Sequence, residues 1–116
     1  MVRGRGEATE EPQALRSVYV TFGDEASARR IANVLVTERL IACANIFPLR
    51  SVFRWDGVIK DEAEWAALLK TTSDRVDALT ARLQGLHDYD VPCIVVLEPS
   101  WALPTYEAWV RSETHP

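Results

Sequence analysis

The stretch WDGVIKDEAEWAALLKTTSDRV, residues 55–76, decides the fold because two incompatible structures fit it. Strong helix formers (Ala, Glu, Leu, Lys and Arg) dominate residues 60–86, and apolar residues recur there at alternating spacings of four and three. Local propensity alone therefore predicts a single helix over residues 60–86. Such a helix is longer than the roughly 8 to 20 residues that are usual in globular proteins.

Two features of the same stretch favour a β-hairpin followed by a shorter helix. Asp-Gly at residues 56–57 is the strongest short-range hairpin signal, because a type I′ turn needs a positive φ at both central positions. Residues 71–73, Thr-Thr-Ser, suit a strand end and a helix N-cap better than a helix interior. We therefore predict a strand over residues 58–71, an N-cap at Ser73 and a helix over residues 74–86.

Upstream of this stretch, the sequence predicts a strand, a helix and a second strand. Residues 17–22, SVYVTF, are β-branched and aromatic, which is typical of a strand. Asp24 suits an N-cap, and apolar residues with helical spacing follow it, so a helix is expected over residues 25–39. Residues 43–55 are extended in character, and Pro48 within them indicates an edge or a bulge.

Downstream, a short strand and a terminal helix complete the pattern. Residues 93–97 form a continuous apolar run, which predicts a strand buried on both faces. Pro104 suits the start of a helix that is expected to end near Ser112. The order β-α-β-β-α-β with an extra C-terminal helix predicts an α+β, ferredoxin-like fold, in which both helices cover one face of an antiparallel sheet.

Composition bounds the class of protein and its surroundings. The 116 residues, 47% hydrophobic and 26% charged, suffice for one soluble domain. Residues 1–16 are rich in Gly, Glu and Arg, so we predict a disordered tail before a domain over residues 17–116. The net charge of −4 argues against a nucleic-acid partner. No apolar run suits a membrane span or a signal peptide, so a cytoplasmic protein with no membrane partner is expected.

Four stretches, in this order and spacing, resemble the CutA family, which is named for divalent-cation tolerance. They are ERLIACANIFP (residues 38–48), RWDGVI (54–59), LLKTTSDRVDAL (68–79) and LHDYDVP (86–92). The resemblance covers about residues 18–112. It implies small ferredoxin-like subunits that form tight homotrimers through a long hairpin of the second and third strands. It further implies a role in the response to metal ions, a connection with copper, and no catalysed reaction.

The predicted hairpin gives an independent physical reason for assembly. A strand over residues 43–55 spans roughly 43 Å, far more than the first strand has to pair with. Apolar residues lie on both of its faces, and the helices can cover only one. Soluble proteins avoid a large exposed apolar surface with an unpaired edge, so another subunit is the simplest cover.

Cys43, Cys93 and His87 are the candidate metal ligands, because thiols and imidazoles suit copper or zinc. Each also has a plainer interpretation, since a cysteine among apolar neighbours is typical of a core and a histidine at a helix C-terminus favours the helix dipole. His87 resembles the family histidine that has been discussed as a metal ligand. Val20 stands where some bacterial relatives carry a cysteine. The resemblance implies copper or another divalent cation as the cofactor.

Four further residues are candidates for a cleft between subunits: Trp55, Glu62, Lys70 and Tyr89. The aromatic pair is also consistent with plain packing, and the charged pair with a solvated salt bridge. Asp88 and Asp90 are interpreted as ordinary polar residues of a loop between a helix and a strand.

Two other functions remain open from the residues alone. One is an enzyme with a Cys-His site, which needs the thiol within about 3 Å of an activating base. The other is a small-ligand signalling module like the PII proteins, which share the ferredoxin-like trimer; this rests on fold analogy. No Gly-rich phosphate loop supports nucleotide binding.

Overall fold

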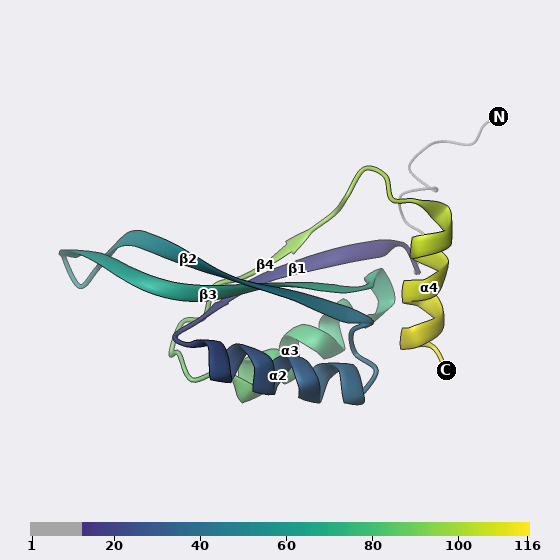
Figure 1. Cartoon of the computed structure of the whole chain (residues 1–116), viewed down its shortest axis with the longest axis horizontal. Coiled ribbons are helices and arrows are strands. Elements are labelled where there is room, and N and C mark those ends of the chain that lie inside the picture. The colour runs from purple at the N-terminus through teal and green to yellow at the C-terminus, as the bar shows by residue number, and fades with distance from the viewer. Residues whose placement is uncertain (1–12) are drawn as a thin grey trace.

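The computed structural model describes residues 13–116 (Figure 1). Most of the predicted tail, residues 1–12, lies outside the described residues, so its disorder stays a prediction. The elements are β1 Leu15–Phe22, α2 Glu25–Thr37, β2 Cys43–Trp55, β3 Val58–Thr72, a 3₁₀ turn Ser73–Arg75, α3 Val76–Leu86, β4 Ile94–Leu97 and α4 Pro104–Thr114.

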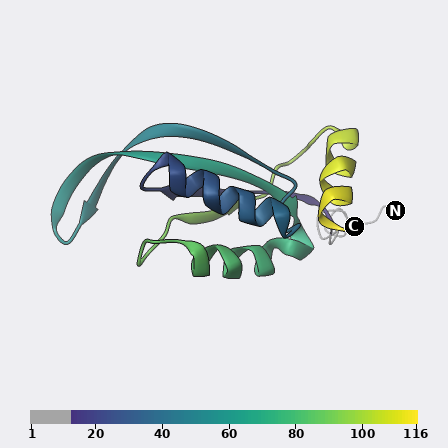
Figure 2. The same cartoon turned by 60° about the horizontal axis from the view of Figure 1, so that its bottom comes forward.

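The four strands form one antiparallel sheet in the order β2-β3-β1-β4. Helices α2 and α3 cover one face of it, and α4 lies at the end where β1 begins (Figures 1 and 2). This is the predicted ferredoxin-like α+β arrangement with an extra C-terminal helix. We call the sheet face opposite α2 and α3 the back face.

The stretch that opened the sequence analysis forms a hairpin, as predicted. Asp56 and Gly57 have φ values of 51° and 76°, the positive values that a type I′ turn requires. Trp55 pairs with Val58, and the ladder between β2 and β3 continues to Cys43 opposite Lys70. The strong helix formers of β3 are therefore overridden by strand pairing and by burial against the helices.

The start of α3 differs from the prediction. Ser73 is not an N-cap; it begins a 3₁₀ turn, and the α-helix starts at Val76 rather than Asp74. The cause is the strand before it, because the Ser73 backbone N–H donates to the Ala14 carbonyl at 2.9 Å and so prolongs the pairing of β3 with β1. The chain needs one tight turn before it can leave the sheet.

The outer bounds of two other elements also differ. β1 begins at Leu15, inside the predicted tail, because Leu15 pairs with Thr72 and is only 7% exposed. Helix α2 ends at Thr37, two residues before the predicted Arg39. Arg39 takes a left-handed φ of 63°, and the Leu40 N–H closes the helix end on the Leu35 carbonyl at 3.0 Å.

The prediction that β4 is buried on both faces is wrong for the single chain. β4 begins at Ile94 and pairs only with β1, so it is an edge strand. Val95, Val96 and Leu97 are exposed. A strand of apolar residues is buried on both faces only if other elements cover it, and among the described residues no element lies beyond β4.

The core lies between the sheet and α2 and α3. Alternate residues of β1 and β3 meet one stripe of each helix, as the two periodicities require. Its fully buried members include Val18, Val20, Phe22, Ile31, Leu35, Leu69, Leu79 and Leu83. A second, smaller cluster of Leu15, Ala42 and Val110 joins α4 to the sheet.

The hairpin extends beyond the rest of the sheet. β1 pairs with β3 only as far as Trp65, so residues 49–55 and 58–64 form a two-stranded ribbon with no third strand among the described residues. At about 3.3 Å per residue, this ribbon projects by roughly 23 Å. Figure 1 shows it as the long arm opposite α4.

Candidate functional site

A groove of about 700 Å³ lies on the back face where the hairpin leaves the sheet. Its walls come from the hairpin, from β1 and from the loop between α3 and β4. Aromatic side chains from all three line it: Tyr19, Phe53, Trp55 and Tyr89. Side chains from distant segments of the described chain thus meet here around open space.

Strand alternation places the hairpin residues in this groove. The register pairs Phe53 with Lys60 and Ser51 with Glu62, and residues directly opposite in an antiparallel ladder share a face. Ser51, Phe53 and Trp55 are two residues apart and so share that face as well. The same parity brings Glu64 into the groove.

Glu64 is the most firmly held charged group of the groove. One carboxylate oxygen accepts a hydrogen bond from the Ser51 hydroxyl at 2.5 Å, and the other accepts one from the Tyr89 hydroxyl at 2.7 Å. Burial, and then the hydrogen bond to Glu64 and the charge of that carboxylate, hold the pKa of Tyr89 far above its ordinary value. Tyr89 is therefore a hydrogen-bond donor throughout the physiological range.

Tyr19 lies in the same negatively charged surroundings. Burial raises the pKa of its phenol first, and the neighbouring Cys93 and Glu64 raise it further. The groove thus disfavours any additional negative charge.

His87 fixes the loop that forms the outer wall. Its Nδ1 accepts a hydrogen bond from the Tyr89 backbone N–H at 3.1 Å, so Nε2 carries the proton and donates to the Thr21 carbonyl at 2.7 Å. The ring stacks on Phe22, with 5.0 Å between centroids. Tyr89 also passes close to Gly23, where a Cβ would lie 3.4 Å from the phenol oxygen. A metal ion at His87 would have to displace one of these two hydrogen bonds.

The three predicted metal ligands do not converge. Cys93 is exposed and lines the groove, whereas Cys43 lies opposite Lys70, at the other end of β1 from His87. The Cys43 sulfur lies 3.3 Å from the Tyr106 hydroxyl. Within residues 13–116, no three His, Cys, Asp or Glu side chains come together in a way that could hold a metal ion. The described residues therefore provide no complete set of metal ligands.

The four residues predicted from the sequence to line a cleft do not all lie together either. Trp55, Glu62 and Tyr89 line the one groove, but Lys70 does not. The Lys70 ammonium donates to the Asn45 side-chain oxygen at 2.7 Å, near α4. Asp88 and Asp90, interpreted from sequence as ordinary loop residues, are part of the groove lining.

Comparison with known proteins identifies the family. Residues 16–113 match the family model described as CutA1 divalent ion tolerance protein. The chain belongs to the CutA1 family. The resemblance found in the four sequence stretches is thereby confirmed over nearly the whole described domain.

Individual CutA proteins are similar along almost their entire length. The divalent-cation tolerance protein CutA of Pyrococcus horikoshii is 40% identical over 97 residues, which are 84% of this chain and 95% of that protein. The protein of the same name from Thermotoga maritima is 42% identical over 94 residues, 81% of this chain and 93% of the relative. The crystal structure of the divalent ion tolerance protein CutA1 from Ehrlichia chaffeensis superposes with a TM-score of 0.85 at 38% identity, covering 89% of this chain and 97% of that one.

The family description names tolerance of divalent ions rather than a chemical reaction. Names of other relatives and solved structures include both chloroplastic and periplasmic CutA proteins, so the family is not confined to one compartment. Among the described residues, no helix has the length and apolar character that crossing a bilayer requires.

Proposed function

We propose that this CutA1 protein is a non-catalytic homotrimer that serves divalent-ion tolerance by binding a divalent cation, with copper as the first candidate, next to its subunit contacts. Membership of the CutA1 family and the names of its relatives support the role in ion tolerance. We further propose that it acts in the cytoplasm.

The observation that carries the assembly is the projecting hairpin. Val52 is 67% exposed and Ile59 is 64% exposed, both on a ribbon that no other described element covers. The sheet also has two unlike open edges, β2 and β4. A contact between unlike surfaces is head-to-tail, and it closes into a ring when the rotation allows. A closed ring leaves no such edge unpaired, and three members are proposed because the resemblance to the CutA family implies a trimer.

The incomplete ligand set supports placing the cation at the subunit contact. Cys93 is an exposed thiol in the groove, and His87, at the other end of the same loop, would join it as a ligand only by giving up one of its two hydrogen bonds. A soft thiolate and an imidazole suit copper or zinc. Because one chain brings no complete site together within its described residues, a neighbouring copy would supply the remaining ligands.

The surroundings of Cys43 and His87 support the absence of catalysis. The hydroxyl of Tyr106, not an imidazole, contacts Cys43. His87 uses one ring nitrogen for Thr21 and the other for Tyr89. An activated Cys-His pair needs a free imidazole nitrogen near the thiol.

Native mass spectrometry tests assembly and metal binding together. The expected mass is close to three times the 13.1 kDa chain, and anaerobic addition of Cu²⁺ or Zn²⁺ should add a whole number of ions per trimer. Calorimetry should show that Cys93→Ser weakens binding by roughly tenfold or more, while the matched control Cys43→Ser does not. A folded monomer at micromolar concentration would overturn the assembly, and equal binding by both variants would remove the cation site from Cys93.

A further inference from the structure

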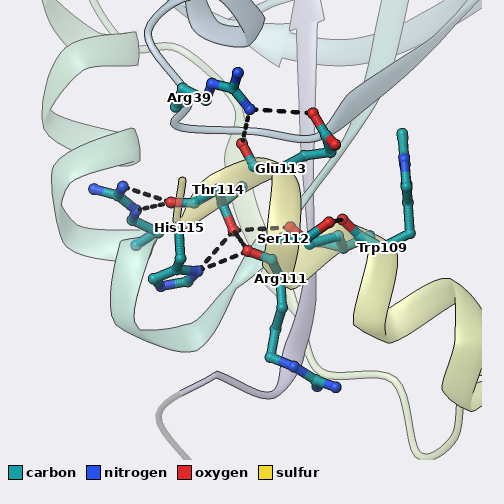
Figure 3. A network of polar contacts seen from close by, with 9 residues as sticks. Arg39, Trp109, Arg111, Ser112, Glu113, Thr114 and His115 are labelled. Carbon is teal, nitrogen blue, oxygen red and sulfur yellow. Dashed lines mark hydrogen bonds and ion pairs between the residues drawn. The ribbon is translucent and has the colours of Figure 1, made fainter.

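His115, at the C-terminal end of α4, faces a hydrogen-bond acceptor at each of its ring nitrogens. Its Nε2 lies 2.8 Å from a carboxylate oxygen of Asp74. Its Nδ1 lies 3.0 Å from the carbonyl oxygen of Arg111, one turn back along the helix (Figure 3). An ionised carboxylate and a carbonyl can only accept, and a neutral imidazole has one N–H where the imidazolium has two. Both contacts are therefore hydrogen bonds only while His115 is protonated.

The hydroxyl of Thr114 does not remove this requirement. It lies 3.1 Å from Nδ1 of His115, but its single hydrogen has a nearer acceptor in the Val110 carbonyl at 2.8 Å. If the hydroxyl turned to donate to an unprotonated Nδ1, the bond to Val110 would be lost, and Arg111 would still lose the bond from the imidazole. Because Thr114 is fully buried, water does not replace the lost bond. Deprotonation of His115 thus costs the last turn of α4 at least one hydrogen bond.

The charges around His115 favour its protonated form. The Asp74 carboxylate faces it from the 3₁₀ turn, and the C-terminal end of a helix, which His115 caps here, favours a cation. The Arg75 guanidinium opposes this from the same turn, yet it donates to the Thr114 carbonyl and does not contact the ring. The other charged side chains of the described residues at this helix end form ion pairs of their own: Arg111 with Glu107, and Arg39 with Glu113.

From this geometry we propose that His115 is a proton-operated clasp on α4. As the imidazolium it ties the last turn of the helix to Asp74, and when it loses its proton it gives up one of the two bonds, so α4 loosens from the sheet. A bond made only by the protonated form favours that form in the folded chain, so the stability that it gives is present at lower pH and is lost as the pH rises. Histidine side chains ordinarily change charge between about pH 5 and 8, which places the clasp in the physiological range.

The element that this clasp controls is α4. Buried Val110 of α4 covers Leu15 of β1 and Ala42 just before β2, in a cluster that is separate from the main core. Loosening α4 therefore exposes these apolar side chains while the main core stays closed. None of the groups of the clasp lines the groove or belongs to the projecting hairpin, so the clasp does not rest on the proposed trimer or cation site.

Hydrogen exchange of the intact protein, corrected for the intrinsic pH dependence of amide exchange, tests the proposal. From about pH 5.5 to about pH 8, the protection of the α4 amides should fall about threefold to tenfold, while the amides of β1 and β3 keep theirs. His115→Gln, which cannot take up a proton, should have weakened α4 protection at the lower pH and less than about twofold change with pH. Asp74→Asn should lose most of the pH dependence. Asp77→Asn, an equal charge change on α3, should keep it.

Proton magnetic resonance gives a second measurement, because the chain has only two histidines. The ring signal that disappears in His115→Gln should change over the same pH interval as the protection of α4. Equal α4 protection at both pH values in wild type, or the same pH dependence in His115→Gln as in wild type, would overturn the proposal. Loss of protection over the whole chain at the higher pH would overturn it as well, since it would show general destabilisation.

Discussion

The two ends of the sheet deal with exposed surface in opposite ways. At the end where β1 begins, α4 closes the sheet with buried Val110 and with polar contacts along its last turn (Figure 3). At the other end, residues 49–55 and 58–64 project without any covering element among the described residues. We call these the closed end and the open end.

The closed end is held by contacts that converge on the C-terminus of α4. Arg39 donates to the carbonyl and a carboxylate oxygen of Glu113, and Arg75 donates twice to the Thr114 carbonyl, at 2.9 and 2.5 Å. The His115 Nε2 lies 2.8 Å from Asp74. These groups satisfy the last carbonyls of the helix, which would otherwise lack partners.

The comparison separates surface that the chain covers itself from surface that the proposed assembly would cover. The small cluster under α4 is nearly complete within one chain, whereas the hairpin is ordered as a strand pair but keeps its apolar side chains in water. A change at the closed end should therefore act on the stability of one subunit. A change at the open end should act on assembly.

The largest expected effect is loss of the assembly by Ile59→Asp. Ile59 is 64% exposed and lies opposite Arg54, so an aspartate there should be tolerated by the single chain and can even pair with that arginine. Burying it in a subunit contact would cost the apolar contact, about 2 kcal/mol per subunit, plus desolvation of a carboxylate. Light scattering with size exclusion should show a well-folded monomer.

The matched control is Val36→Asp, which introduces the same charge at a 43%-exposed apolar position on α2, away from the open end. It should keep the wild-type mass. Equal dissociation in both variants would mean that added charge, not the hairpin, decides assembly, and the distinction between the two ends would fail.

The next effect in size is at the closed end, from Arg75→Ala. Removing a charged donor that makes two hydrogen bonds to one carbonyl should destabilise α4 by about 1 to 3 kcal/mol. Hydrogen exchange should then accelerate in α4 by tenfold or more while the hairpin amides keep their protection. Arg29→Ala, which removes an exposed ion pair on α2, serves as control and should change neither region. Uniform acceleration over the whole chain would show that α4 does not open separately.

Sequence reasoning succeeded where local chemistry and the hydrophobic pattern agreed. Asp56-Gly57 demanded a type I′ turn, and that turn converted a stretch of helix-forming residues into a strand. Sequence reasoning failed where the structure of a residue depends on contacts with residues far along the chain. Leu15 looked like part of a polar tail, because its pairing with Thr72 joins segments that are far apart in the chain.

Only part of the candidate site could be predicted from the sequence, for a similar reason. Counting outward from the turn predicts that Trp55, Glu62 and Glu64 share a face. Lys70 lies on the same face, but the register places it opposite Cys43 at the closed end, away from the groove. The contribution of the loop cannot be obtained by counting. The bond between His87 and Thr21, which joins residues 66 apart in the sequence, holds the loop that places Tyr89 beside Glu64.

A smaller, pH-dependent effect should appear at the closed end. Burial alone would raise the pKa of Asp74, but hydrogen bonds from Thr72 and His115 and the charge of His115 hold it below the ordinary value of 3.8. A lowered folded-state pKa means stability that is present above pH 3.8 and is lost as the pH falls through the folded-state value. Because the side chains of His115 and Asp74 are 26% and 34% exposed, solvent screening limits the contribution to less than about 1 kcal/mol.

Asp74→Asn tests this effect. The variant should be less stable than wild type in urea at pH 6, and the difference should shrink progressively as the pH falls below 3.8. Hydrogen exchange should place the difference in α4. Asp77→Asn changes the same charge without the contact to His115, and it should follow the wild-type curve. If the two variants behave alike, the Asp74–His115 contact contributes nothing to closing this end.

The smallest effect is spectroscopic, and it compares the two ends through their tyrosines. All three tyrosines have pKa values raised above 10.0: Tyr19 and Tyr89 in the groove, and Tyr106 under α4, where burial and then the contact with Cys43 raise it to about 12. Near-ultraviolet titration of the folded protein should therefore show little phenolate at pH 10, whereas the chain unfolded in guanidinium should be half ionised. Cys43→Ala should shift only the Tyr106 step downward, and only in part, because burial remains. Tyrosines that titrate near pH 10 in the folded wild type would show that neither end shields its phenols. A shift of all three tyrosine titration steps in Cys43→Ala would show that the two ends are not independent.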